Sequence, residues 1–236
     1  MSECIVSGAG EKMDCMICGK PLVYGAAGKM RKCSICGREF FSHEECEAGH
    51  YVCSECHAGN GSRVLGYIKT STEKNPGAIM EAVWNMPEVH LFGPEHHKIL
   101  PCVLLSAYRN CGGNVSESDF DTAWERGSGV PGGACGYWGV CGASIGMGIF
   151  FSVILGDTPL NPSMWPLVQS YTSRCLKRIS EIGGPRCCKR TCRTAINVAA
   201  EIVAESCGIN MPVSWKPCGY SAMNRECLRE SCPYHG

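Results

Sequence analysis

Four short pairs of metal-binding residues in the first 60 positions constrain this 236-residue chain more than any other feature. Two residues separate the members of each pair, a spacing at which the backbone turns around one ion and places both side chains on it. Thiolate and imidazole groups satisfy tetrahedral zinc, and eight ligands are enough for two such ions. The predicted ligands are Cys15, Cys18, Cys33, Cys36, His43, Cys46, Cys53 and Cys56.

The order of these ligands, four cysteines, one histidine and three cysteines, resembles that of cross-brace zinc modules of the RING, PHD and FYVE type. The resemblance implies a treble-clef-like module in which the first and third pairs share one zinc ion, and the second and fourth pairs share the other. Sequential pairing, as in consecutive zinc ribbons, and occupancy by an iron-sulfur cluster are alternatives that the spacing leaves open. We expect the two other histidines nearby, His50 and His57, to be exposed and without a role.

Charge, apolar length and cysteine content narrow the classes of function. The chain has 22 basic and 22 acidic residues, which argues against a nucleic-acid binder held by phosphate contacts. The most apolar part of the uncharged segment 128–156, residues 143–155, is shorter than the roughly 20 residues of a membrane-spanning helix. The first residues lack the features of a signal peptide, and paired cytosolic cysteines stay reduced. We therefore expect a cytoplasmic protein of an anaerobe, whose 20 cysteines favour metal binding over a disulfide framework.

The composition changes near residue 60, where cysteine pairs give way to longer apolar-periodic segments. The sequence predicts a mainly α fold: a zinc-binding module over residues 1–60, then a cysteine-rich helical domain over residues 61–236. Residues 57–62, HAGNGS, have the small and polar character of a linker. A short strand is predicted at 64–68, and helices are predicted over 75–86, 93–113, 115–127, 138–155, 163–182 and 188–206.

Individual residues refine these helices. Asn75 and Ser116 are suited to cap the helices that follow them. Pro101 is expected to kink or divide the helix over 93–113, because it lacks a backbone N–H. Gly142 and Gly146, four residues apart, would let a neighbouring backbone approach one face of their helix.

Twelve further cysteines follow residue 60, which exceeds the ordinary use of cysteine in a core. They gather in three segments: the glycine-rich GGACGYWGVCGAS, the basic PRCCKRTCR, and a C-terminal run in which a proline follows the last cysteine. Convergence of three or four thiolates would bind a cluster. The candidate cofactor ligands are Cys135, Cys141, Cys188 and Cys192 as a central set, with Cys218, Cys227 and Cys232 from the C-terminal run.

The segment PRCCKRTCR, residues 185–193, places Cys187 and Cys188 at the start of a predicted helix. Unpaired N–H groups and neighbouring basic side chains favour negative charge there, so we expect lowered thiol pKa values. Three uses stay open: ligation of an iron-sulfur cluster, thiol redox or sulfur transfer with this pair as the catalytic residues, and a third zinc or plain packing. We expect a solvated helix face for the basic run 174–193 and an exposed first turn at residues 95–97.

The segments CGYWGVCGAS, GGPRCCKR and CGYSAMNRECLRESCPYHG together resemble an uncharacterised cysteine-rich domain family of anaerobic bacteria and archaea, over residues 60–236. Some relatives carry this domain beside an S-adenosylmethionine-dependent methyltransferase, so the resemblance implies a methyltransferase or redox enzyme as partner. We predict a zinc and iron-sulfur protein of anaerobic redox or sulfur metabolism. The competing hypothesis is a non-enzymatic scaffold that recruits a partner enzyme through its zinc module.

Overall fold

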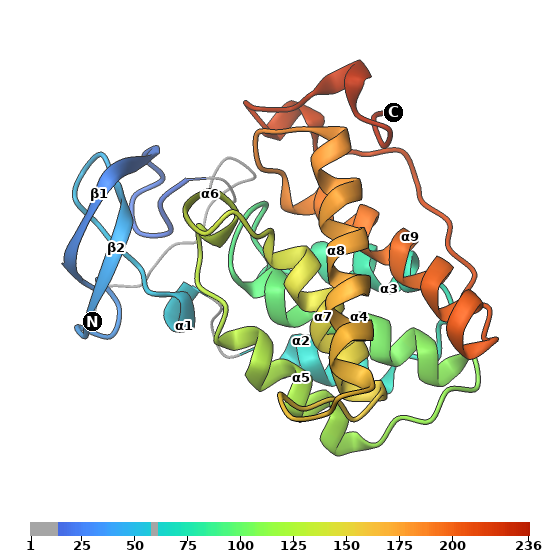
Figure 1. Cartoon of the computed structure of the whole chain (residues 1–236). Coiled ribbons are helices and arrows are strands. Elements are labelled where there is room, and N and C mark those ends of the chain that lie inside the picture. The colour runs from blue at the N-terminus through green and yellow to red at the C-terminus, as the bar shows by residue number, and fades with distance from the viewer. Residues whose placement is uncertain (1–13, 58–60) are drawn as a thin grey trace.

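The computed structural model describes residues 14–57 and 61–236, and it is mainly α-helical with a small cysteine-rich module at its N-terminal end. The antiparallel strands β1 (Leu22–Lys32) and β2 (Glu39–Cys46) and the short helix α1 (Ser54–His57) form this N-terminal module. Figure 1 shows the hairpin at one side of a helical body, with α6 (Ala134–Tyr137) facing it. A hydrogen bond from the Tyr137 hydroxyl to the Gly25 carbonyl joins the two parts.

The helical body is built around α4 (Glu95–Asn110), which contacts five other helices. Ile99, Leu100 and Leu104 on this helix are fully buried, so it forms the centre of the hydrophobic core. The remaining helices are α2 (Ser62–Thr70), α3 (Pro76–Trp84), α5 (Glu117–Ser128), α7 (Gly142–Ile154), α8 (Met164–Ile182) and α9 (Cys188–Cys207), followed by the 3-10 turns η1 (Ser221–Met223) and η2 (Arg229–Ser231).

The six predicted helices are confirmed as α3, α4, α5, α7, α8 and α9. Both predicted caps are present: the Asn75 side chain accepts a hydrogen bond from the Gly77 N–H, and Ser116 forms a capping box with Asp119. Such caps satisfy N–H groups that the first helical turn leaves unpaired. Local chemistry therefore fixed where these helices begin.

One local expectation is wrong, and a second holds at most in its weaker form. Residues 64–68 lie in α2 rather than in a strand, because Val64 and Ile68, four apart, are buried on one helix face. Pro101 does not divide α4, which runs unbroken through it. Packing of α4 against α5 and α7 holds the helix together, so tertiary contacts outweigh the lost hydrogen bond.

The close approach predicted at Gly142 and Gly146 is confirmed. A Cβ on Gly142 would collide with the His97 ring, and a Cβ on Gly146 would lie 3.1 Å from the His97 carbonyl oxygen. The apolar helix α7 thus lies directly against α4. It has 13 residues, and none of the helices in the described part of the chain combines the length and apolarity that crossing a bilayer requires.

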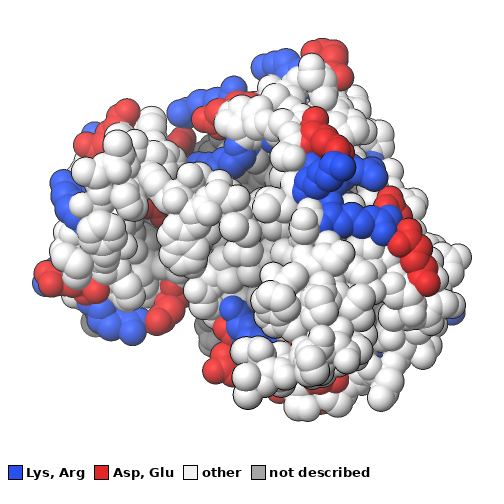
Figure 2. Space-filling view, viewed as in Figure 1, with Lys and Arg blue, Asp and Glu red and all other residues white. Residues whose placement is uncertain are grey.

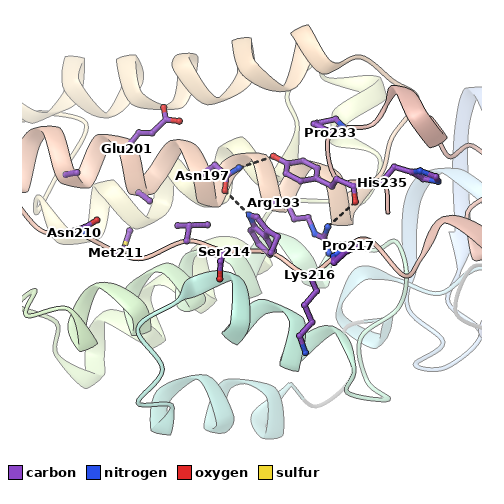
Figure 3. A pocket seen from close by; sticks show the side chains of 15 residues that line it. Arg193, Asn197, Glu201, Asn210, Met211, Ser214, Lys216, Pro217, Pro233 and His235 are labelled. Atoms are coloured by element: carbon purple, nitrogen blue, oxygen red, sulfur yellow. Dashed lines mark hydrogen bonds between the residues drawn. The ribbon is translucent and has the colours of Figure 1, made fainter.

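The C-terminal segment returns from the end of α9 to the start of that helix (Figure 1). Gly208 ends α9 in the left-handed conformation, and Cys218 pairs with His235 near the chain end. Figure 3 shows the cavity of about 790 Å³ between this segment and α9, where Asn197 binds both the Tyr234 hydroxyl and the Trp215 N–H. These contacts bring the C-terminal cysteines close to Cys187.

Candidate metal centres

Two groups of four potential ligands lie in the N-terminal module, and in each group every ligand atom is within 4.8 Å of the others. The Sγ atoms of Cys18 and Cys46 are 3.8 Å apart, and those of Cys36 and Cys53 are also 3.8 Å apart. Zinc–sulfur bonds of ~2.3 Å in a tetrahedron place two sulfurs ~3.8 Å from each other, whereas a disulfide needs ~2 Å. The first group is Cys15, Cys18, Cys46 and His50, and the second is Cys33, Cys36, Cys53 and Cys56.

Two matching turns shape the first cysteine pair of each group. The N–H of Gly19 bonds to the Cys15 carbonyl, and the N–H of Gly37 bonds to the Cys33 carbonyl, both at 2.8–2.9 Å. Both glycines have positive φ angles, 68° and 72°. Residues with a side chain rarely adopt this backbone conformation, so a glycine after each cysteine pair lets the chain turn around an ion.

Strand pairing explains why the groups interleave along the chain. In the antiparallel hairpin Leu22 pairs with Cys46, which brings the pair before β1 beside the end of β2. Cys33 directly follows β1, and the Cys53 N–H donates to its sulfur at 3.4 Å. The observed pairing is therefore interleaved, as the cross-brace arrangement implies, and not sequential.

The predicted ligand His43 is not in either group, and His50 takes its place. His43 lies on β2 three residues before Cys46, and side chains separated by an odd number of strand positions point to opposite faces. A turn at Gly49 brings His50 back, so its Nδ1 lies 3.4 Å from the Cys46 sulfur. His43 instead stacks on Tyr137 with ring centroids 4.1 Å apart.

Backbone N–H groups prepare some of these sulfurs for ionisation. Burial raises the pKa of Cys33, but the N–H groups of Cys36, Cys53 and Ile35 outweigh it and lower that pKa to about 6. Burial also raises the pKa of Cys46, and N–H donors that include His50 lower it to about 7. A thiolate is the form that ligates zinc, so both groups have the chemistry of metal centres.

The central cysteine set of the helical body lines one cavity of about 660 Å³, here named the thiol cavity. Its walls come from the loop around α6, the start of α7 and the start of α9, which are distant in the sequence. These sulfurs do not form a group with all ligand atoms within 4.8 Å among the described residues. The cysteines that line it are Cys135, Cys141, Cys187, Cys188 and Cys192.

The C-terminal cysteines line a second, much smaller cavity of about 20 Å³, which we name the C-terminal thiol pocket. Cys187 lines both cavities, whereas Cys188 lines only the first of them. The Arg190 N–H donates to the Cys187 sulfur at 3.5 Å, and the Arg229 N–H donates to the Cys227 sulfur at 3.3 Å. The cysteines of this pocket are Cys187, Cys218, Cys227 and Cys232.

The expected lowering of the thiol pKa values at the start of α9 is wrong. Burial raises the pKa of Cys188 to about 12, and it also raises the pKa values of Cys187 and Cys192. The N-terminal position of Cys187 is as predicted, because it caps α9. Desolvation outweighs the helix dipole and the basic neighbours at this position.

Three basic side chains of the run 174–193, expected in solvent, are buried: Lys189, Arg190 and Arg193. Lys189 donates to the His90 carbonyl at 3.0 Å, and Arg190 donates to the Gly183 carbonyl at 2.9 Å. Neither has a carboxylate within ion-pair distance among the described residues, and Arg193 has only Glu81, at 3.3 Å. The solvated-face expectation holds for the α8 part, where Figure 2 shows basic and acidic side chains together.

A third group of possible ligands, which the sequence pattern does not indicate, lies where the module meets the helical body: His57, His90 and Glu95. Glu95 is 2% exposed and His96 is 1% exposed, so residues 95–97 are not an open first turn. Burial raises the pKa of Glu95, but the histidines around it lower that pKa well below its usual range. The sequence pattern does not indicate His57 as a ligand, because this residue follows a cysteine pair that is already complete.

The family comparison matches residues 64–235, more than half of the chain, to the family described as a family of unknown function, DUF5714. The chain belongs to this family. No curated protein and no solved structure matches it. The DUF5714 region contains every cysteine of the thiol cavity and of the C-terminal thiol pocket, whereas both ligand groups of the N-terminal module lie outside it.

Proposed function

We propose that this DUF5714 protein binds two zinc ions in its N-terminal module and an iron-sulfur cluster in its thiol cavity, and that it acts in redox or sulfur metabolism in the cytoplasm of an anaerobe. The observation that carries the proposal is the convergence of five cysteines, from segments up to 57 residues apart, on one cavity. Cys135, Cys141, Cys188 and Cys192 are the proposed ligands.

The spacing of these thiols favours a cluster over a third zinc ion. Ligands of one zinc ion touch each other, as the cysteines of the N-terminal module do. Ligands of a cluster bind different iron atoms, so the inorganic core keeps their sulfurs apart. Cysteines that line a common cavity but do not form a group of three or more with all sulfurs within 4.8 Å of one another have the second arrangement.

The positive charges of the buried residues Lys189 and Arg190 match the negative charge of a thiolate-bound cluster. Burial lowers the pKa of Lys189 to about 8, because the charged ammonium group loses its water there. Thiolates bound to iron carry net negative charge, which would compensate Lys189 and Arg190. A buried cation that has carbonyl partners but no carboxylate nearby is costly, so its presence beside the cysteines supports an anionic occupant.

The alternative, a zinc scaffold that recruits a partner enzyme, has one specific observation in its favour. The N-terminal module exposes the apolar side chains of Met30, Ile35 and Phe41, which are 54–64% accessible. We propose this surface as the contact for a partner such as a methyltransferase or redox enzyme. The scaffold function differs from the main proposal by requiring no iron.

Metal analysis and absorbance spectra of anaerobically purified protein test the proposal. We expect iron, sulfide and broad visible absorption in addition to zinc. Cys188→Ser and Cys141→Ser should each remove most of the visible absorption, while Cys111→Ser, outside both cavities, should keep it. Zinc alone, with no visible absorption, would overturn the cluster and leave the scaffold function.

A further inference from the structure

We propose that His57, His90 and Glu95 form a third metal site, which binds a divalent ion such as zinc between the N-terminal module and the helical body. Its ligands come from the last residue of α1, the loop before α4, and the first residue of α4. The site shares no residue with the two cysteine groups or with the thiol cavity. It therefore stands or falls independently of the iron-sulfur cluster.

The spacing of the three side chains fits one ion. The His57 Nδ1 lies 3.2 Å from Glu95 Oε2, and the His90 Nδ1 lies 3.6 Å from Glu95 Oε1. Zinc bonds to nitrogen and oxygen of ~2.0–2.1 Å place tetrahedral ligand atoms ~3.4 Å apart. The two imidazole rings do not stack flat, because their planes are tilted by 54° with centroids 4.5 Å apart.

The polar atoms that face one another here lack other partners. The Nδ1 atoms of His57 and His90 and the Oε2 atom of Glu95 are buried, and apart from their contacts with one another they have no hydrogen-bond partner. Glu95 is 2% exposed, and the His57 ring is the group within ion-pair distance of its Oε2 atom, so this buried carboxylate depends on a nearby cation. A metal ion would satisfy all three atoms at once.

The surrounding structure holds the ligands in place. His57 directly follows Cys56, a member of the second cysteine group, so a zinc ion there would fix its backbone. The other carboxylate oxygen of Glu95, Oε1, accepts a hydrogen bond from the backbone N–H of His90 at 3.0 Å. This bond holds the two proposed ligands Glu95 and His90 together. The carboxylate lies over Gly93, where a Cβ would collide with it. Gly93 is therefore needed for the position of Glu95.

Three protein ligands leave one position of a tetrahedral zinc ion for water or a small substrate. His57 also lines a cavity of about 80 Å³ in the seam between module and body, which has room for water. Cys188 and Arg186 line the same cavity. One ligand of an ion at this site would thus line the same cavity as the proposed cluster ligand Cys188.

Zinc stoichiometry of the full-length protein tests the site. Wild-type protein and the variants Glu95→Gln and His90→Gln are loaded with Zn²⁺, desalted and analysed for bound zinc. We expect each variant to hold one zinc fewer per chain than wild type. His235→Gln, a histidine outside all three groups, should hold the wild-type amount.

Two readouts separate loss of the site from loss of the fold or of the cluster. Circular dichroism identifies a variant that does not fold, and His90→Gln, at the more exposed rim, then replaces Glu95→Gln. Iron content and visible absorption should be unchanged by either substitution. Equal zinc in wild type and folded variants would overturn the third site and show a metal-free histidine–carboxylate cluster.

Discussion

His43 and His50 show how the direction of one side chain decides a ligand. Both are near Cys46, and in the sequence His43 has the better spacing, because it completes a pair with two intervening residues. That spacing works only where the backbone turns. On a strand it points the two side chains to opposite faces, so the turn at Gly49 makes His50 the neighbour of Cys46 instead.

We predict that His50→Ala loses one zinc ion from the module, while His43→Ala keeps both. Loss of a ligand should also make the module sensitive to proteases, because so small a unit relies on its metal for stability. Zinc content and limited proteolysis of both variants check this. Loss of zinc from His43→Ala alone would restore the pairing expected from the sequence.

The pKa values of the cysteine thiols at the start of α9 also depend more on burial than on the charges of neighbouring residues in the sequence. The basic residues around Cys187 and Cys188 predict thiolates, yet burial raises the pKa values of both. Sequence shows which charges are near along the chain. It does not show how much water remains around them, and the loss of that water dominates here.

Among the elements, the central helix α4 is close-packed because its neighbours carry glycine at the contacts. Gly127 on α5 lies so close that a Cβ would be 2.5 Å from the Cα atom of Lys98. Gly66 on α2, by contrast, is exposed and has nothing within 4 Å of an added Cβ. The same residue type therefore has opposite effects on stability at these two positions.

Alanine substitutions test this contrast between glycines. Gly127→Ala should destabilise the protein by ~1–3 kcal/mol, because the added methyl group collides with the backbone of α4. Gly66→Ala should stabilise it by ~0.5–1 kcal/mol, because alanine loses less conformational entropy in a helix. Thermal or urea unfolding measures both. Equal effects of the two variants would contradict the packing described for α4 and α5.

At the scale of the whole molecule, the two parts rely on different sources of stability. In the described part of the module the buried apolar cluster consists of Cys33, Tyr51 and Cys53, two of which are proposed ligands. The helical body has a continuous apolar core that extends from α2 to α9. Arg186 contacts both parts, since its guanidinium lies 4.8 Å from the rings of Tyr24 and Phe92.

We predict that a zinc chelator under reducing conditions unfolds the N-terminal module and leaves the helical body folded. Proteolytic cleavage should then appear within residues 14–57, while the helical circular dichroism signal stays nearly unchanged. Re-addition of zinc should restore resistance. A module that resists proteases without metal, or a helical body that melts with it, would contradict this division of stability.

The sequence by itself determined the six longer helices from α3 to α9, two of their caps and the mainly α fold, because periodic apolar residues and end-capping side chains act over a few residues. It also predicted seven of the eight residues that the fold brings together in the two cysteine groups, because the paired spacing encodes a local turn. Only the tertiary structure decided that His50 replaces His43, that Lys189 and Arg190 are buried beside the C-terminal thiol pocket, and that His57 meets Glu95. These outcomes depend on strand direction, on burial and on contacts between segments far apart in the chain, none of which is a property of neighbouring residues.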